Sequence, residues 1–131
     1  MIDHTDPRQY SEAVRECWSV HQALRQLGFD SGDIYVATAK DARNPQTPLS
    51  LFVILRTQGK EFVVTLAGYP SEEAVEAELS RWSTFATLSN EGAFDEDVLD
   101  EIYQCSNVMQ NKEQFVVALF SKGIRPSQQW S

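Results

Sequence analysis

The sequence predicts an α+β fold: an N-terminal helix, a three-stranded antiparallel sheet in meander order, and three C-terminal helices that pack on one sheet face. Three observations lead to this prediction. Two runs rich in Leu, Val, Ile and Phe flank a glycine between residues 49 and 68. Apolar residues recur at helical spacing on both sides of that segment. The chain of 131 residues has the length of one domain, so we treat 1–131 as a single unit with loose termini at 1–5 and 125–131.

Residues 49–68 predict a β-hairpin. Gly59 followed by Lys60 matches a two-residue type II′ turn, because such a turn places glycine at its first central position. This turn would pair Gln58 with Glu61 and so set the register of the two strands. Side chains alternate between faces along a strand, so one face becomes almost wholly apolar, and we expect the helices to cover it. That face consists of Leu51, Val53, Leu55, Phe62, Val64 and Leu66.

The second face of the hairpin is neither clearly apolar nor clearly polar. It carries Phe52, Ile54, Arg56, Val63, Thr65 and Ala67. A half-apolar second face in an antiparallel sheet calls for an explanation, and a partner that covers it is one. A further strand is predicted at 34–39, and its Tyr35 can join this face. We therefore expect a homodimer through an interface formed by Tyr35, Phe52, Ile54, Val63 and Thr65.

Capping signals define the N-terminal helix. Asp6 followed by Pro7 and, three residues after the cap, Gln9 is typical of a helix start. The helix is expected to end at Leu27, because Gly28 can adopt the left-handed conformation of a C-cap. Its expected buried stripe consists of Tyr10, Ala13, Val14, Cys17, His21, Leu24 and Leu27.

Three further helices are expected after the hairpin. Ser71 and Asp95 provide N-caps for the first two. Asn111 provides a cap for the third, which is expected to run through Lys122. The loop from 40 to 48 contains two prolines, which bar regular strand pairing there.

The two cysteines, Cys17 and Cys105, both fall on apolar stripes of predicted helices, so we expect buried, reduced thiols. No CxxC or Cys/His spacing indicates a structural zinc site. The N-terminus has neither a basic start nor an apolar core, and no apolar run approaches the roughly 20 residues of a membrane span. We therefore expect a cytoplasmic protein without a signal peptide.

The net charge of −8 is concentrated in one segment. Ten acids and one base lie between 70 and 101, which gives that segment a charge of −9 and leaves +1 for the rest of the chain. This distribution disfavours a generic binder of nucleic acid or anionic membrane, which needs clustered Lys and Arg. The acids, including the run DEDVLDE at 95–101, suit either a solvated face or a docking surface for a basic protein on the 71–101 helices.

Few residues suggest chemistry. Cys17 and His21 are one helical turn apart, as a thiol–imidazole pair requires, but a buried neutral histidine explains the same position. Asp3, His4 and Asp6 include the ligand types of several metals, but a terminus offers no second shell to orient them. GxGxxG, GxxxxGK[ST], GxSxG and HExxH are absent. We therefore predict no catalytic residue, no metal and no cofactor.

Lys40 and Arg43 lie in the long loop, and Arg56 lies on the ambiguous sheet face. Cations that converge on a half-apolar face can hold an anionic ligand, whereas scattered cations only increase solubility. The sequence therefore supports two functions ahead of a third, a cofactor-free enzyme that uses Cys17 and His21. The first is a non-catalytic protein-interaction module that forms a homodimer. The alternative is a small-ligand-binding or regulatory domain with an anion-favouring pocket near the 40–48 loop and Arg56.

Overall fold

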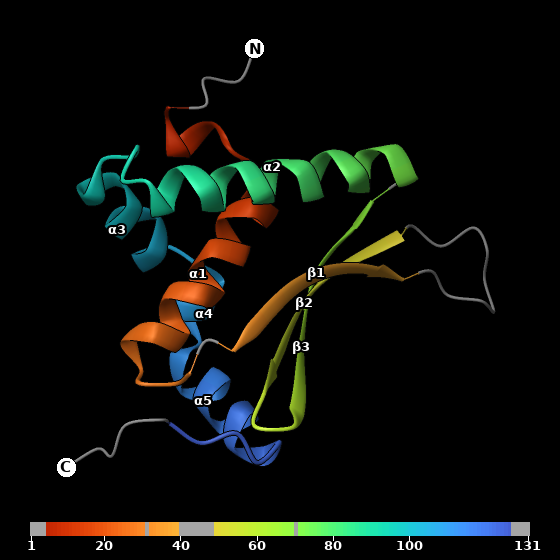
Figure 1. Cartoon of the computed structure of the whole chain (residues 1–131), viewed down its shortest axis with the longest axis vertical. Helices are drawn as coiled ribbons and strands as arrows, with labels where there is room; N and C mark the ends of the chain where they lie inside the picture. Colours follow the sequence, from red (N-terminus) through yellow and green to blue (C-terminus); the bar gives the residue numbers. More distant parts are fainter. Residues whose placement is uncertain (1–4, 31, 40–48, 70, 127–131) are drawn as a thin grey trace.

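The structure is a computed structural model that describes residues 5–30, 32–39, 49–69 and 71–126. It confirms the predicted α+β fold, with a helix, a three-stranded antiparallel sheet and then several helices (Figure 1). The elements in chain order are η1 (Pro7–Gln9), α1 (Glu12–Gln26), β1 (Asp33–Ala39), β2 (Leu49–Thr57), β3 (Lys60–Tyr69), α2 (Glu72–Asn90), α3 (Glu96–Gln104), α4 (Asn107–Gln110) and α5 (Lys112–Ser121).

The sheet is a meander in the order β1-β2-β3, as predicted, but its hairpin turn differs from the prediction. Thr57 pairs with Lys60, so the two central residues of the turn are Gln58 and Gly59. Both have positive φ, 55° and 71°, which is the type I′ pattern. The expected type II′ turn at Gly59-Lys60 is wrong, because the sequence did not show that Gln58 would adopt the left-handed conformation.

The new turn changes the register without exchanging the two faces. Leu55 pairs with Phe62 instead of Val64, and Val53 pairs with Val64, which is a shift of two residues along β3. Side chains alternate with a period of two, so between Phe52 and Thr65 this two-residue shift keeps the side chains on their predicted faces. Beyond that stretch Leu51 pairs with Ala67, where the prediction had Gly68. The ladder is interrupted once, between Leu51 and Phe52, where β3 carries an extra residue.

The helices cover the predicted face of the sheet. Figure 1 shows α1, α4 and α5 on one side of it, while α2 crosses the ends of the strands. Leu51, Val53 and Leu55 are 1–2% exposed. The ring of Phe62 packs edge-to-face on Phe115 of α5, with 5.8 Å between centroids. This layer forms the hydrophobic core.

The N-terminal helix begins later than predicted. Asp6 caps only the short η1, by accepting a hydrogen bond from the backbone N–H of Arg8 at 3.0 Å. Tyr10 is extended and buried, and Ser11 then caps α1 by accepting from the N–H of Val14 at 3.3 Å. The single helix from Pro7 is therefore wrong, because a second local cap competes with the first one.

Helix α1 lies at the centre of the molecule, where it contacts α2, α3, α4 and β3. Residues 16–20 are all buried, so the burial is much wider than the predicted stripe. His21 and Ala13, both assigned to that stripe, are only half-buried. Its C-terminal end matches the prediction: Gly28 has φ 82°, and the N–H of Phe29 donates to the carbonyl of Leu24 at 2.9 Å.

The C-terminal region contains four helices among the described residues, one more than predicted. Ser71 and Asp95 cap α2 and α3 as expected. Helix α3 then ends, because Ser106 caps a separate short helix, α4, by accepting from the N–H of Met109. Asn111 precedes α5 but makes no side-chain cap, since its amide donates to the carbonyl of Asn107 at 3.0 Å.

Candidate functional site

The face of the sheet away from the helices carries the predicted interface residues, and we call it the open face. Cross-strand pairing places Tyr35, Ile54 and Val63 in one row across the three strands. The row on one side of it contains Phe52 and Thr65. The open face thus consists of Tyr35, Phe52, Ile54, Arg56, Val63 and Thr65, with Ala37, Asp33 and Glu61 completing its rows.

Much of the open face is accessible to solvent. Tyr35 is 41% exposed and Val63 is 44% exposed, while Phe52 and Ile54 on the central strand are half-buried. On the other side of the central strand, Val53 and Leu55 are 1% exposed. The structure therefore places the predicted interface residues together on the less covered of the two faces.

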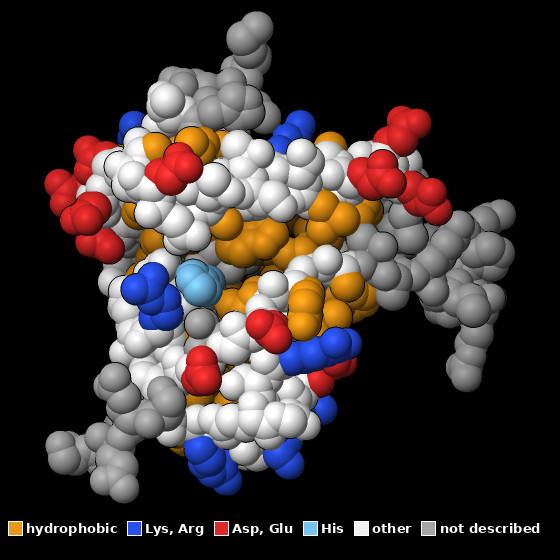
Figure 2. Space-filling model, viewed as in Figure 1, with side chains coloured by type: hydrophobic (Ala, Val, Ile, Leu, Met, Phe, Trp, Pro, Cys, Tyr) orange, Lys and Arg blue, Asp and Glu red, His pale blue; other side chains and the backbone are white. Residues whose placement is uncertain are grey.

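Apolar surface also continues around the β1 edge. Ile34 and Val36 belong to the helix-covered face but are only partly buried, as is Trp82 of α2. Figure 2 shows hydrophobic side chains reaching the surface between α2 and β1. The helices thus cover β2 more completely than β1.

Arg56 lies at the polar end of the open face. Its Nε donates to Oε2 of Glu61 at 2.8 Å, and this hydrogen bond raises the pKa of Arg56. Its guanidinium also lies 5.1 Å from the centroid of the Tyr35 ring. Lys40 and Arg43, the other candidate ligands of an anion, lie outside the described residues. The anion pocket stays a prediction. Of its three candidate residues the structure describes Arg56, whose guanidinium is paired with the carboxylate of Glu61.

Cys17 is not placed to act as a nucleophile. Its side chain is 1% exposed, and burial, together with the charges of Glu78 and Glu16, raises its pKa to about 12. The thiol is therefore protonated at neutral pH, whereas the thiolate is the reactive form. Burial also lowers the pKa of His21, so its imidazole is neutral. Cys105 is exposed at the end of α3, which corrects the prediction that both thiols are buried.

Of the three candidate metal ligands, the structure describes Asp6. Asp6 caps η1, and Asp3 and His4 lie outside the described residues. Among the residues that the structure does describe, no group of three or more His, Cys, Asp or Glu side chains could hold a metal ion. None of the described helices is both long and apolar enough to cross a membrane.

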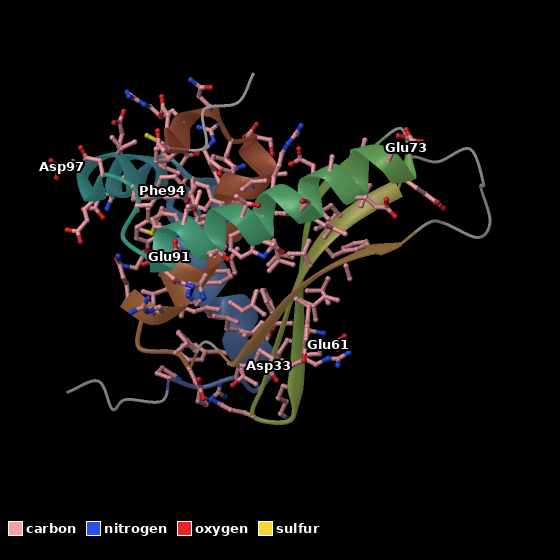
Figure 3. The ribbon with its side chains drawn as sticks, turned by 45° about the horizontal axis from the view of Figure 1, so that its top comes forward. Asp33, Glu61, Glu73, Glu91, Phe94 and Asp97 are labelled. Atoms are coloured by element: carbon pink, nitrogen blue, oxygen red, sulfur yellow. The ribbon has the colours of Figure 1, made fainter. Side chains whose placement is uncertain are left out.

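The acidic residues of the 71–101 segment divide into two groups. Figure 2 shows acidic side chains at both ends of α2, and Figure 3 labels Glu73 at one end with Glu91 and Asp97 at the other. A helix of 19 residues is about 28 Å long, several times the Debye length of roughly 8 Å at physiological salt. The two groups therefore act on a partner separately, and docking of a basic protein there stays a prediction.

Sequence reasoning missed one feature, a groove of about 620 Å³ beside β3. Its walls are β3 from Phe62 to Leu66, the start of α1, the α4 helix and the start of α5. These segments are far apart in the sequence, and the one available signal was that the last strand of a meander has an unpaired edge.

Comparisons with known protein families, with curated proteins and with solved structures found no match to this chain.

Proposed function

We propose that this protein is a non-catalytic interaction module that forms a symmetric homodimer through the open face of its sheet. The supporting observation is the row of Tyr35, Ile54 and Val63, whose outer members are 41% and 44% exposed on a face that the α1, α4 and α5 helices leave uncovered. Contiguous apolar surface of this kind is typical of association sites.

The arrangement of polar groups supports the same proposal. In a two-fold symmetric dimer the same patch contacts itself, so a central residue such as Ile54 meets its own copy near the axis. Arg56 and Glu61 form an exposed ion pair in the last row of the face. They would lie at the rim, where protein interfaces are polar. Facing sheets pack about 10 Å apart, which leaves room for aromatic side chains between them.

The solution mass of an Ile54→Asp variant tests the proposal. A carboxylate on the central strand would have to be buried between the two sheets, so we expect a folded monomer in place of the wild-type dimer by light scattering. Val117→Asp is the matched control, because Val117 is 65% exposed on α5 and lies outside the open face. It should remain a dimer.

A second variant separates loss of assembly from loss of folding. Tyr35→Asp changes a more exposed residue on an outer strand, and circular dichroism reports whether each variant keeps its secondary structure. A wild-type protein that is already monomeric contradicts the proposal. So do two folded variants that keep the wild-type mass.

A further inference from the structure

The groove beside β3 has the walls of a peptide-binding site. One wall is the strand itself, from Phe62 to Leu66, and the opposite wall comes from α4 and the start of α5. Val108 and Phe115 are buried and form its apolar floor together with Phe62. The start of α1 also lines the groove. The volume of the groove, about 620 Å³, lies in the range of ligand sites.

The strand wall offers unpaired backbone groups. β3 is the last strand in the sheet order, so one of its edges pairs with no other strand among the described residues. Such an edge presents a row of N–H and C=O groups to an incoming chain. An extended peptide can pair with that row and place alternate side chains into the groove, a recognised mode of peptide binding.

The charges in the groove define what would enter it. Glu12 and Glu16 are the only ionisable side chains that line it within the described residues. They lie one turn apart on α1. Burial raises the pKa of Glu16, and the charge of Glu12 adds to this shift. The other polar side chains in the lining are uncharged, namely Ser11, Thr65, Asn107, Asn111 and Gln114. A cation would relieve the repulsion between the two carboxylates, whereas a further anion would increase it.

We propose that this groove binds an extended basic peptide of a partner protein, which adds to the edge of β3 and places a lysine or arginine beside Glu12 and Glu16. Apolar side chains of the peptide would contact Phe62, Val108 and Phe115. This site lies beside the homodimer interface and shares Val63 and Thr65 of β3 with it.

Fluorescence anisotropy with a labelled peptide tests the proposal. The probe is a blocked peptide of about eight residues in which pairs of lysines alternate with pairs of valines. It spans about 26 Å when extended and carries both residue types on each face. Two peptides serve as matched probes. One replaces each lysine by glutamate, and the other keeps the lysines but carries backbone N-methyl groups at alternate residues, which prevents strand pairing. We expect saturable binding of the first peptide below about 100 μM and at least tenfold weaker binding of both others.

Two variants of the protein locate the binding site. Glu12→Lys reverses the charge in the groove and should weaken binding of the lysine peptide by about tenfold or more. Glu72→Lys is its matched control, because Glu12 and Glu72 are both exposed first residues of serine-capped helices. The two variants have the same net charge, so general attraction to an acidic protein would be weakened equally in both. If the groove is the site, Glu72→Lys should bind like the wild type.

Most of the remaining outcomes overturn the proposal, and the last one supports it. Binding that tolerates N-methylation, or that Glu12→Lys and Glu72→Lys weaken equally, indicates only general attraction to an acidic protein. Absence of binding to the wild type and to Ile54→Asp also overturns it and leaves the homodimer proposal unaffected. Binding to Ile54→Asp but not to the wild type indicates that a second copy of this chain fills the groove. Conversely, a monomeric wild type that binds the peptide supports the groove and contradicts the dimer.

Discussion

The side-chain amide of Gln58 forms two hydrogen bonds with the backbone of Arg125. Its Nε2 donates to the Arg125 carbonyl at 2.6 Å, and its Oε1 accepts from the Arg125 N–H at 3.1 Å. Arg125 is held further by its guanidinium, whose Nη1 donates to the carbonyl of Phe120 at 3.0 Å. The tip of the hairpin is thereby fastened to the segment that follows α5. This pair also helps to explain why Gln58 is kept at a φ of 55°, a conformation that costs a non-glycine residue on the order of 1 kcal/mol.

We predict that Gln58→Asn loosens the segment around Arg125 while the hairpin keeps its turn. Asparagine tolerates positive φ, but its shorter side chain does not reach the Arg125 backbone. Hydrogen exchange at the Arg125 amide should accelerate by about tenfold or more, since its acceptor is lost. The amide of Lys60 reports on the turn and should keep its protection. Unchanged exchange at Arg125 would show that the two hydrogen bonds do not hold this segment.

Alkylation should distinguish the two thiols. Cys105 is exposed, so iodoacetamide should modify it in the folded protein, whereas Cys17, with a pKa of about 12, should react only after unfolding. Mass spectrometry of the intact protein should therefore show one rapid modification. Cys105→Ser should abolish it. Rapid alkylation of Cys17 in the folded protein would contradict its assignment as a core residue and favour a thiol–imidazole pair with His21.

The stability of the protein should depend on pH through Glu16. Burial raises the pKa of this carboxyl above 4.5, although its hydrogen bond from the N–H of Asn107 at 2.7 Å opposes the shift. The folded state therefore binds more protons than the unfolded state between these two pKa values. The stabilisation by the protonated form is present below about pH 4.5 and is lost as the pH rises through the folded pKa.

We predict that Glu16→Gln, which stays neutral and keeps an oxygen for Asn107, gains stability relative to the wild type as the pH rises from about 4 to about 7. Urea denaturation at both pH values measures the difference in the free energy of unfolding. Glu101→Gln is a control, because Glu101 is exposed on α3. If the free energy of unfolding of Glu16→Gln relative to the wild type falls as the pH rises, hydrogen bonding to the charged carboxylate outweighs its burial.

A buried carboxylate on α2 fastens the start of α1. Glu78 is 5% exposed. It accepts one hydrogen bond from the hydroxyl of Ser11 and another from Nη1 of Arg81 at 2.8 Å. We predict that Glu78→Ala lowers the free energy of unfolding by about 2 kcal/mol, because it leaves half-buried donors without their acceptor. Glu76→Ala, an exposed position on the same helix, should change it by less than about 0.5 kcal/mol. Equal effects of the two substitutions would contradict this role of Glu78.

Local signals in the sequence determined the order of the elements and several of their ends. Ser71, Asp95 and Gly28 cap helices as predicted, because a cap involves only a few neighbouring residues. Alternation in 49–68 likewise identified the two faces of the sheet. From Phe52 to Thr65 that assignment survived the wrong turn type, because the register error there was an even number of residues.

The tertiary structure alone decided the features that depend on contacts between distant segments. Gln58 adopts its turn conformation in contact with Arg125, Glu16 binds the start of α4, and the groove forms where β3 meets α1, α4 and α5. The spacing of apolar residues also could not show that α2, α3, α4 and β3 would enclose α1 on most of its sides. The sequence thus determined what short-range hydrogen bonding and side-chain alternation control. The fold determined the surfaces available to partners, because exposure depends on which distant segments pack together.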